Sequence, residues 1–145
     1  MTAQRVCVDT ERFGPLDIDV EQIIEVPDGF LGFPELRRLV LIPVDDDATF
    51  CWMQSVDDPA TAFLAVAPWS FFPDYEVTLR DDDADALALR RAEDAVTWCL
   101  ITVHREPDRF TANLLGPVLV NNALRRGRQV ILREDLPTQA ELLVG

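Results

Sequence analysis

The sequence predicts a mainly all-β fold, a small barrel or sandwich with one or two short helices. Short apolar runs recur along the chain and end at turn-forming residues, so about eight short strands are expected. Several runs alternate between apolar and polar residues, as a strand with one exposed face does. Only one stretch has a clear helix pattern. The chain of 145 residues fits a single domain spanning 1–145.

The N-terminal third is expected to hold strands at residues 5–8, 16–20 and 23–26. In the second of these, Leu16, Ile18 and Val20 alternate with acidic residues, which predicts one buried and one exposed face. A Pro-Asp-Gly sequence supplies the turn after the third. Residues 34–38 begin with Pro, which suits the first position of a helix, so one helical turn is expected there.

The centre of the chain is expected to hold two strands joined by an acidic turn. Residues 50–55 and 62–67 are short apolar runs, and the Asp-Asp-Pro sequence between them has turn chemistry. Residues 39–44 are expected to form the strand before them. Residues 95–103 are apolar on both alternating faces, which is typical of a central strand.

The clear helix is expected over residues 81–91, with Asp as N-cap, because aspartates crowd its start and arginines its end. We interpret these aspartates as a solvated cap. Further on, Arg125–Arg128 is expected to form the turn between strands at 118–121 and 129–132. Thr138 and Glu141 have the spacing of a capping box, so the C-terminal segment either makes a last helical turn or frays.

The composition limits the classes of partner. The net charge is −13, and all 13 basic residues are Arg. Nucleic-acid phosphates are neutralised by Lys and Arg, so direct nucleic-acid binding is not expected, whereas attraction to a basic protein is. No apolar run approaches the roughly 20 residues of a membrane helix, and the N-terminus lacks a signal-peptide pattern. A cytoplasmic protein without membrane contact is expected.

Motifs for catalysis or metal binding are absent from the sequence. The three cysteines, Cys7, Cys51 and Cys99, lie far apart in apolar runs, so buried reduced thiols are expected. With one His and no Cys-x-x-Cys, neither a metal site nor a cofactor is predicted. Nucleotide fingerprints and nucleophile elbows are also missing, which favours a binding protein over an enzyme.

The chain resembles the FliW family of flagellar assembly factors over nearly its whole length. The most characteristic sequence is Phe72-Pro73-Asp74-Tyr75. The other matching stretches are residues 13–18, 26–36, 53–59, 62–63, 111–117 and 127–132. Each stretch is weak alone, but their order and spacing together are specific. The resemblance implies a β-barrel-like domain. It departs at residues 136–145, which are apolar where family members tend to have a short polar or basic tail.

The resemblance also implies a function and two protein partners. Family members are non-enzymatic cytoplasmic regulators that bind flagellin before its export and bind CsrA, an RNA-binding repressor of flagellin translation. When flagellin leaves the cell, the freed family member sequesters CsrA and translation resumes. We expect the same partners for this chain.

The candidate contact residues lie in two aromatic loops. Between Pro68 and Pro73 the chain is too aromatic and proline-rich for a central strand, so it either packs on the core or meets a partner. Aromatic residues are favoured at interface centres, so Phe71, Phe72 and Tyr75 are candidate anchors, with Asp74 accepting hydrogen bonds from a basic partner. The alternative is that Phe72 and Tyr75 plug the end of the barrel. Phe30 and Phe33 form a second candidate surface, for which core packing is the favoured interpretation.

Two other functions are compatible with a β-barrel. A small ligand could bind in its mouth. An oligonucleotide-binding barrel could stack bases on its aromatic residues, but the charge of −13 argues against it.

Overall fold

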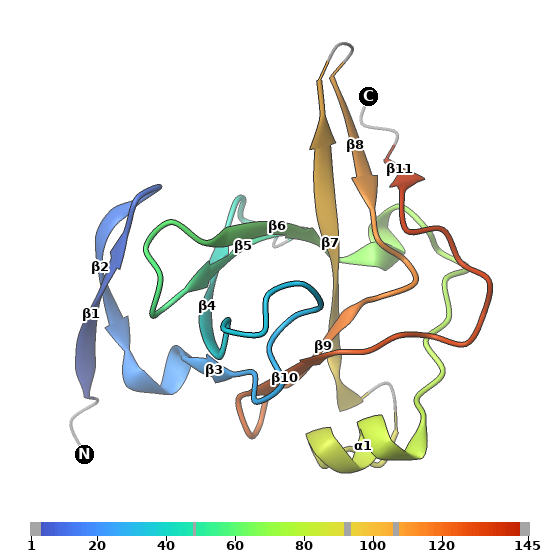
Figure 1. Cartoon of the computed structure of the whole chain (residues 1–145), viewed down its shortest axis with the longest axis horizontal. Coiled ribbons are helices and arrows are strands. Elements are labelled where there is room, and N and C mark those ends of the chain that lie inside the picture. Colours follow the sequence, from blue (N-terminus) through green and yellow to red (C-terminus); the bar gives the residue numbers. More distant parts are fainter. Residues whose placement is uncertain (1–3, 48, 92–93, 106–107, 143–145) are drawn as a thin grey trace.

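The computed structural model describes residues 4–47, 49–91, 94–105 and 108–142. Eleven strands, one α-helix and two 3-10 helices are assigned within these ranges (Figure 1). They are β1 (Arg5–Thr10), β2 (Gly14–Asp19), η1 (Val20–Gln22), β3 (Ile24–Glu25), β4 (Arg38–Pro43), β5 (Phe50–Ser55), β6 (Ala62–Val66), η2 (Pro68–Ser70), α1 (Asp81–Leu87), β7 (Val96–His104), β8 (Arg109–Ala112), β9 (Val118–Asn121), β10 (Arg126–Gln129) and β11 (Ala140–Glu141).

Seven of the strands close into a barrel. Hydrogen-bonded neighbours follow the order β7-β6-β5-β4-β3-β10-β9, and β9 pairs again with β7, which completes the ring. These pairs are antiparallel except for β3 with β10, which is parallel. Closure removes the open edges that a flat sheet would expose. The predicted all-β class is therefore confirmed, and its architecture is a barrel.

Strand β7 is divided among three neighbours. Its first residues, Val96 to Trp98, pair with β9, and Cys99 and Leu100 pair with β6. Its last residues, Ile101 to His104, pair with β8, and β8 in turn pairs with β11. This outer half stands off the barrel as a hairpin (Figure 1). One long strand therefore carries both the barrel closure and a small second sheet.

The β1–β2 ribbon forms a separate two-stranded sheet beside the barrel (Figure 1). The turn between its strands contacts β5, where Phe13 packs edge-on to Trp52 and the Arg12 guanidinium lies 3.9 Å from the centre of the Trp52 ring. Within the ribbon, Val8 is buried and the alternate residue Cys7 faces water. Of the three cysteines expected to be buried, Cys7 is thus a wrong prediction. Cys51 and Cys99 are buried, and burial raises the pKa of each thiol to about 12.

Two apolar cores lie on the two faces of the barrel wall. The inner core collects side chains from all around the ring: Ile24, Val26, Phe30, Leu36, Leu39, Cys51, Met53, Ala65, Trp98, Val118 and Val120. The outer core lies between the wall and the segments that cover it: Val66, Tyr75, Leu87, Leu89, Cys99, Ala112, Leu114, Leu119, Val130, Leu132, Ala140 and Leu142. Adjacent residues such as Trp98 and Cys99 enter different cores because side chains alternate along a strand. This explains why residues 95–103 are apolar on both faces.

The helix is shorter than predicted. It begins at Asp81 after Arg80, the N-cap residue, which makes no side-chain cap bond, and it ends at Leu87 because Ala88 adopts a left-handed φ of 54°. Arg90 and Arg91 therefore lie beyond the helix, and Asp is not its N-cap. The aspartates are also not all solvated. The Asp83 side chain is only 9% exposed and pairs with Arg128 of β10, with Nε and Oδ1 3.0 Å apart.

Three local predictions in the loops and the tail are wrong because long-range pairing overrides local pattern. Residues 126–129 form β10 rather than a turn, and the reversal falls before it, where Arg125 has a φ of 53°. Of residues 34–38, expected to form a helical turn, 34–35 form a turn and Arg38 begins β4. Ala140 and Glu141 extend the β8 edge as β11, so that Ala140 and Leu142 enter the outer core.

The Asp83–Arg128 pair makes a direct prediction about stability. We expect Asp83→Asn to lower the free energy of unfolding by about 1–3 kcal/mol, because it removes the more buried of the two carboxylates that pair with the Arg128 guanidinium and leaves only Asp28. Asp82→Asn removes a charge at an exposed position of the same first helical turn. We expect this substitution to change the free energy of unfolding by less than about 0.5 kcal/mol. Urea unfolding followed by circular dichroism measures both. Equal effects would show that only the helix dipole matters.

Candidate functional site

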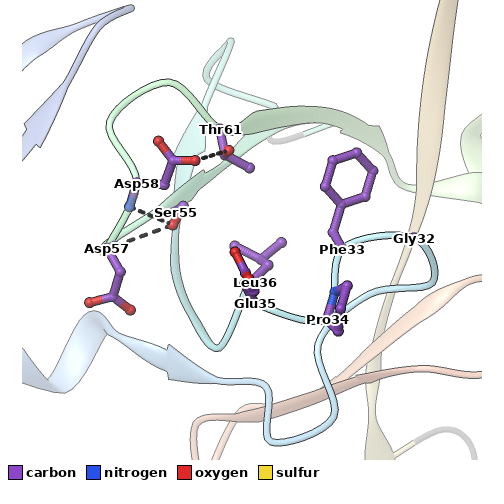
Figure 2. Close-up of a pocket in the computed structure, with 9 residues that line it drawn as sticks. All are labelled: Gly32, Phe33, Pro34, Glu35, Leu36, Ser55, Asp57, Asp58 and Thr61. Carbon is purple, nitrogen blue, oxygen red and sulfur yellow. Dashed lines mark hydrogen bonds between the residues drawn. The ribbon is translucent and has the colours of Figure 1, made fainter.

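A groove opens at one side of the barrel between two turns. One wall is the aromatic turn, residues 29–34, and the other is the acidic turn, residues 57–60 (Figure 2). The groove has a volume of about 410 Å³. It is lined by Gly32, Phe33, Pro34, Glu35, Leu36, Ser55, Asp57, Asp58 and Thr61. The size lies within the range of sites that bind small molecules or side chains of a partner.

The aromatic turn is held rigidly. Phe30 and Phe33 exchange two backbone hydrogen bonds, of 3.0 and 2.8 Å, which makes a tight reversal around Leu31 and Gly32. The Leu31 N–H donates to Oε1 of Gln129 at 2.8 Å and ties the turn to β10. Gly29 and Gly32 both have positive φ, of 67° and 82°. The turn is thus preformed rather than shaped by a ligand.

The aromatic side chains of this turn divide between core and surface. Phe30 is buried in the inner core, and its ring lies 5.7 Å from that of Phe63. Phe33 packs edge-on against the same ring at 4.8 Å, yet 47% of it is exposed. Core packing, the favoured interpretation for this loop, therefore describes Phe30, whereas Phe33 lines the groove.

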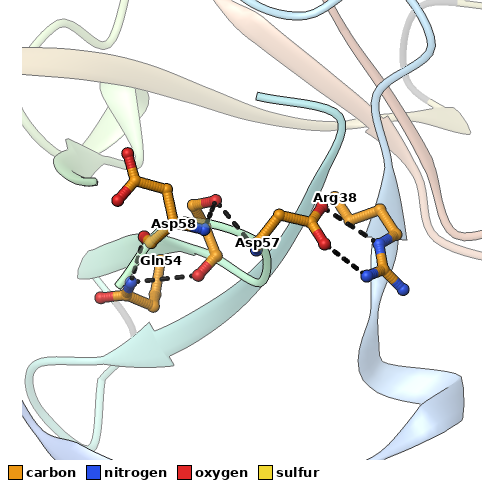
Figure 3. A network of polar contacts seen from close by, with 5 residues as sticks. Arg38, Gln54, Asp57 and Asp58 are labelled. Carbon is orange, nitrogen blue, oxygen red and sulfur yellow. Dashed lines mark hydrogen bonds and ion pairs between the residues drawn. The ribbon is translucent and has the colours of Figure 1, made fainter. Parts of the chain in front are cut away.

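The acidic turn is organised from inside by Gln54 (Figure 3). Its Nε2 group faces four backbone carbonyls of the turn, those of Ser55 at 3.0 Å, Thr61 at 3.2 Å, and Asp58 and Pro59 at 3.4 Å. The Ser55 hydroxyl accepts hydrogen bonds from the backbone of Asp57 and Asp58. The buried side-chain nitrogen of Gln54 is therefore satisfied. Its buried Oε1 makes no hydrogen bond to the described residues.

Two carboxylates of the turn are held in the charged form by their hydrogen bonds. Asp57 accepts two bonds from the Arg38 guanidinium, one of them 3.2 Å long between Nε and Oδ2, and this lowers the pKa of Asp57. The same pair raises the pKa of Arg38. Asp58 accepts from the Thr61 hydroxyl at 2.6 Å and from the Ala60 N–H at 3.0 Å, and these bonds lower the pKa of Asp58. The groove is therefore acidic at neutral pH.

The loop at residues 71–75 is placed mainly against the outer core. Tyr75 is 7% exposed, and its hydroxyl donates to the Leu114 carbonyl at 2.6 Å. Burial raises the pKa of this phenol. Phe71 and Phe72 are partly buried against the same core, and Phe71 packs 5.7 Å from the ring of Phe50. Of the four residues predicted here as partner contacts, Asp74 alone is fully on the surface.

The sequence patterns do not predict this groove. They predict only a turn at residues 57–59 and a helical turn at residues 34–38. A signal was present, since two of the stretches that carry the family resemblance, 26–36 and 53–59, supply nearly all of its lining. The two stretches meet because β4 and β5 pair antiparallel, with Leu39 opposite Ser55.

The described residues show no obvious site for an inorganic cofactor or a membrane span. Within residues 4–47, 49–91, 94–105 and 108–142, no three His, Cys, Asp or Glu side chains are grouped to hold a metal ion. Among the helices of the same ranges, none combines the length and apolar character needed to cross a bilayer. Fold and site together define a small β-barrel whose accessible features are a rigid aromatic turn and an acidic groove.

Comparison with known proteins identifies the family. The model of the FliW protein family matches residues 7–142. The flagellar assembly factor FliW of Magnetococcus marinus is 40% identical over 129 residues, which cover 88% of this chain and 80% of the relative. That of Syntrophus aciditrophicus is 34% identical over 145 residues, with 95% and 92% covered. A crystal structure of the flagellar assembly factor FliW superposes with a TM-score of 0.85 at 31% identity, covering 96% of this chain and 98% of the other. The chain belongs to the FliW family.

The aromatic turn allows a test of its rigidity. A Cβ at Gly29 would lie 2.7 Å from the backbone of Pro34, whereas at Gly32 it would meet open space. Both positions have positive φ, so both Ala substitutions carry backbone strain. We expect Gly32→Ala to destabilise the fold by about 1 kcal/mol and Gly29→Ala by at least about 2 kcal/mol more, from overpacking.

Urea unfolding of the two variants beside the wild type measures this difference. Equal destabilisation by Gly29→Ala and Gly32→Ala would contradict the close approach of Gly29 to Pro34.

Proposed function

We propose that this protein is a cytoplasmic, non-enzymatic regulator of flagellar assembly that binds CsrA and antagonises it, and that also binds flagellin. The observation that carries the proposal is membership of the FliW family across residues 7–142. In this scheme, flagellin that awaits export occupies the protein and leaves CsrA free to repress flagellin translation. Export of flagellin then releases the protein to sequester CsrA.

The charge of the protein supports an electrostatic component of CsrA antagonism. An RNA-binding protein must offer a basic surface to phosphates, and a domain with a net charge of −13 is attracted to it. Exposed carboxylates are grouped at residues 45–47, 57–58 and 81–82. A single charge pair at contact distance in water is worth only about 1 kcal/mol. Several carboxylates close to the RNA path are therefore needed to repel RNA, and a protein with these exposed groups can supply them.

The candidate contact residues can now be ranked by accessibility. Tyr75 and Phe30 are buried, so in the folded monomer they support the loops rather than touch a partner. Phe33 and Asp74 are accessible, and Trp69, five residues before Asp74, is 45% exposed. We propose Phe33 and Asp74 as the members of the predicted set that contact partners directly, with Phe71 and Phe72 positioning the Asp74 loop.

The small-ligand alternative gains no specific support. The inside of the barrel is filled by large buried side chains, among them Ile24, Leu39, Met53 and Trp98. A ligand would have to bind outside this core.

Binding of the two partners is tested with purified components. We expect the protein to bind the host's CsrA and the host's flagellin separately in calorimetry. Excess flagellin is expected to release CsrA from a preformed complex in size-exclusion chromatography. If neither partner binds, the family fold is present without this function. If both bind simultaneously without competition, the switch between partners is wrong although both interactions exist.

The electrostatic mechanism is tested by salt. At saturating protein, so that all CsrA is in complex, the loss of RNA affinity caused by the protein is expected to shrink as NaCl rises from about 50 to 500 mM, because the Debye length falls from more than 10 Å to under 5 Å. A fluorescent RNA carrying the CsrA site reports the affinity, and CsrA alone is the control for its own salt dependence. Inhibition that is unchanged across this range would indicate direct blocking of the RNA site.

A further inference from the structure

The groove beside Phe33 combines exposed apolar surface with uncompensated negative charge. Phe33 lines the groove and is 47% exposed, and Leu31, which lies on the same turn outside the lining, is 75% exposed. The turn is fixed by backbone hydrogen bonds and by Gln129. Because the backbone of this turn is already fixed, a partner that covers these side chains need not order the backbone, which suits an interface anchor.

The charges that line the groove are of one sign. Its ionisable residues are Glu35, Asp57 and Asp58. Asp57 is paired with Arg38, whereas Glu35 and Asp58 make no ion pair with any of the described residues. The apolar wall of Phe33 and Pro34 faces the acidic turn across the groove (Figure 2). A cation in the groove would thus find unmatched carboxylates beside an aromatic ring.

We propose that this groove docks a protein segment in which an Arg or Lys stands next to a large apolar residue. The apolar side chain covers Phe33, and the cation lies between Glu35 and the acidic turn. Charge complementarity selects this occupant: nucleic acid and an anionic membrane surface are both repelled by the carboxylates, and a free metal cation would make no use of the apolar wall.

The inference deepens the proposed function, since it locates a docking face for a basic protein partner. It is tested without CsrA or flagellin, so that its failure is separate from failure of the proposed function. If the groove binds as described but neither protein does, only the proposed function is wrong. If both proteins bind but a short basic and apolar peptide does not bind to the groove, only the proposed docking of such a segment is wrong.

The probe is the peptide acetyl-Ser-Leu-Arg-Ser-amide, titrated to about 10 mM into 15N-labelled protein, because a two-residue contact is expected to bind in the millimolar range. We expect amide shifts to concentrate in residues 31–36 and 55–61 and to fit a single site. The matched peptide acetyl-Ser-Leu-Glu-Ser-amide is expected to bind at least about fivefold more weakly, since an attractive charge contact becomes a repulsive one. The peptide acetyl-Ser-Gly-Arg-Ser-amide lacks the Leu side chain, and it is likewise expected to bind more weakly than the Leu-Arg peptide.

Variants connect the shifts to the groove. Asp58→Asn keeps the shape of the side chain and removes one charge, and Phe33→Ala removes the apolar wall. Each substitution is expected to weaken binding of the Leu-Arg peptide about threefold or more. Glu76→Gln and Leu124→Ala change an exposed charge and an exposed apolar residue that do not line the groove, and are expected to leave binding unchanged. If Phe33→Ala fails to fold, the Asp58→Asn variant and the comparison of the Leu-Arg with the Leu-Glu peptide still test the proposal. Absence of binding, shifts spread over other surfaces, or equal binding of the Glu peptide would overturn the proposal.

Discussion

The pairing of β7 with β9 is the contact on which the rest of the structure depends. Without it, the strands from β7 through β3 and β10 to β9 would form an open sheet with two long edges. With it, the ring is complete and the backbone groups of both edges are paired. The remaining half of β7 is then free to carry β8 and, through it, the C-terminal strand β11. The barrel and its outer layer are therefore joined through one continuous strand.

Closure also decides which surfaces are available to partners. Where β6, β7 and β9 meet, their buried residues pack on two cores, inside on the barrel core and outside on the core formed with α1, the 71–75 loop and the tail. An aromatic loop that looked suited to recognition is consequently committed to packing, with the Tyr75 hydroxyl bonded to the Leu114 carbonyl. On β5 the β1–β2 ribbon contacts the ring through Phe13 and Trp52, whereas residues 31–35 before β4 and residues 57–60 after β5 are exposed. Here the aromatic and acidic turns remain accessible.

The sequence was informative where burial and chain direction are local properties. The predicted strand at residues 50–55 has the observed bounds, and the apolar run 95–103 corresponds to β7, whose residues Thr97 to Cys99 are buried on both faces. Predictions from the local sequence pattern are wrong where pairing with residues far away in the chain determines the structure. The capping-box pattern at Thr138 was overridden by the exposed edge of β8, and the Arg128 side chain found Asp83 and Asp28, which no local pattern could reveal. The groove required two separate stretches to meet, so only the family resemblance pointed to both.

The parallel contact between β3 and β10 has a consequence for synthesis of the chain on the ribosome. It joins Glu25 to Arg126, so the ring is sealed by residues that emerge from opposite ends of translation. A nascent chain that stops before β9 holds β3 and β7 with unpaired edges, and such edges are where unfinished β proteins associate wrongly. The protein can therefore reach its closed form only after nearly all of its residues have left the ribosome. Closure of the ring is a late event, and the long sequence separation of the sealing strands makes that event intrinsically slow.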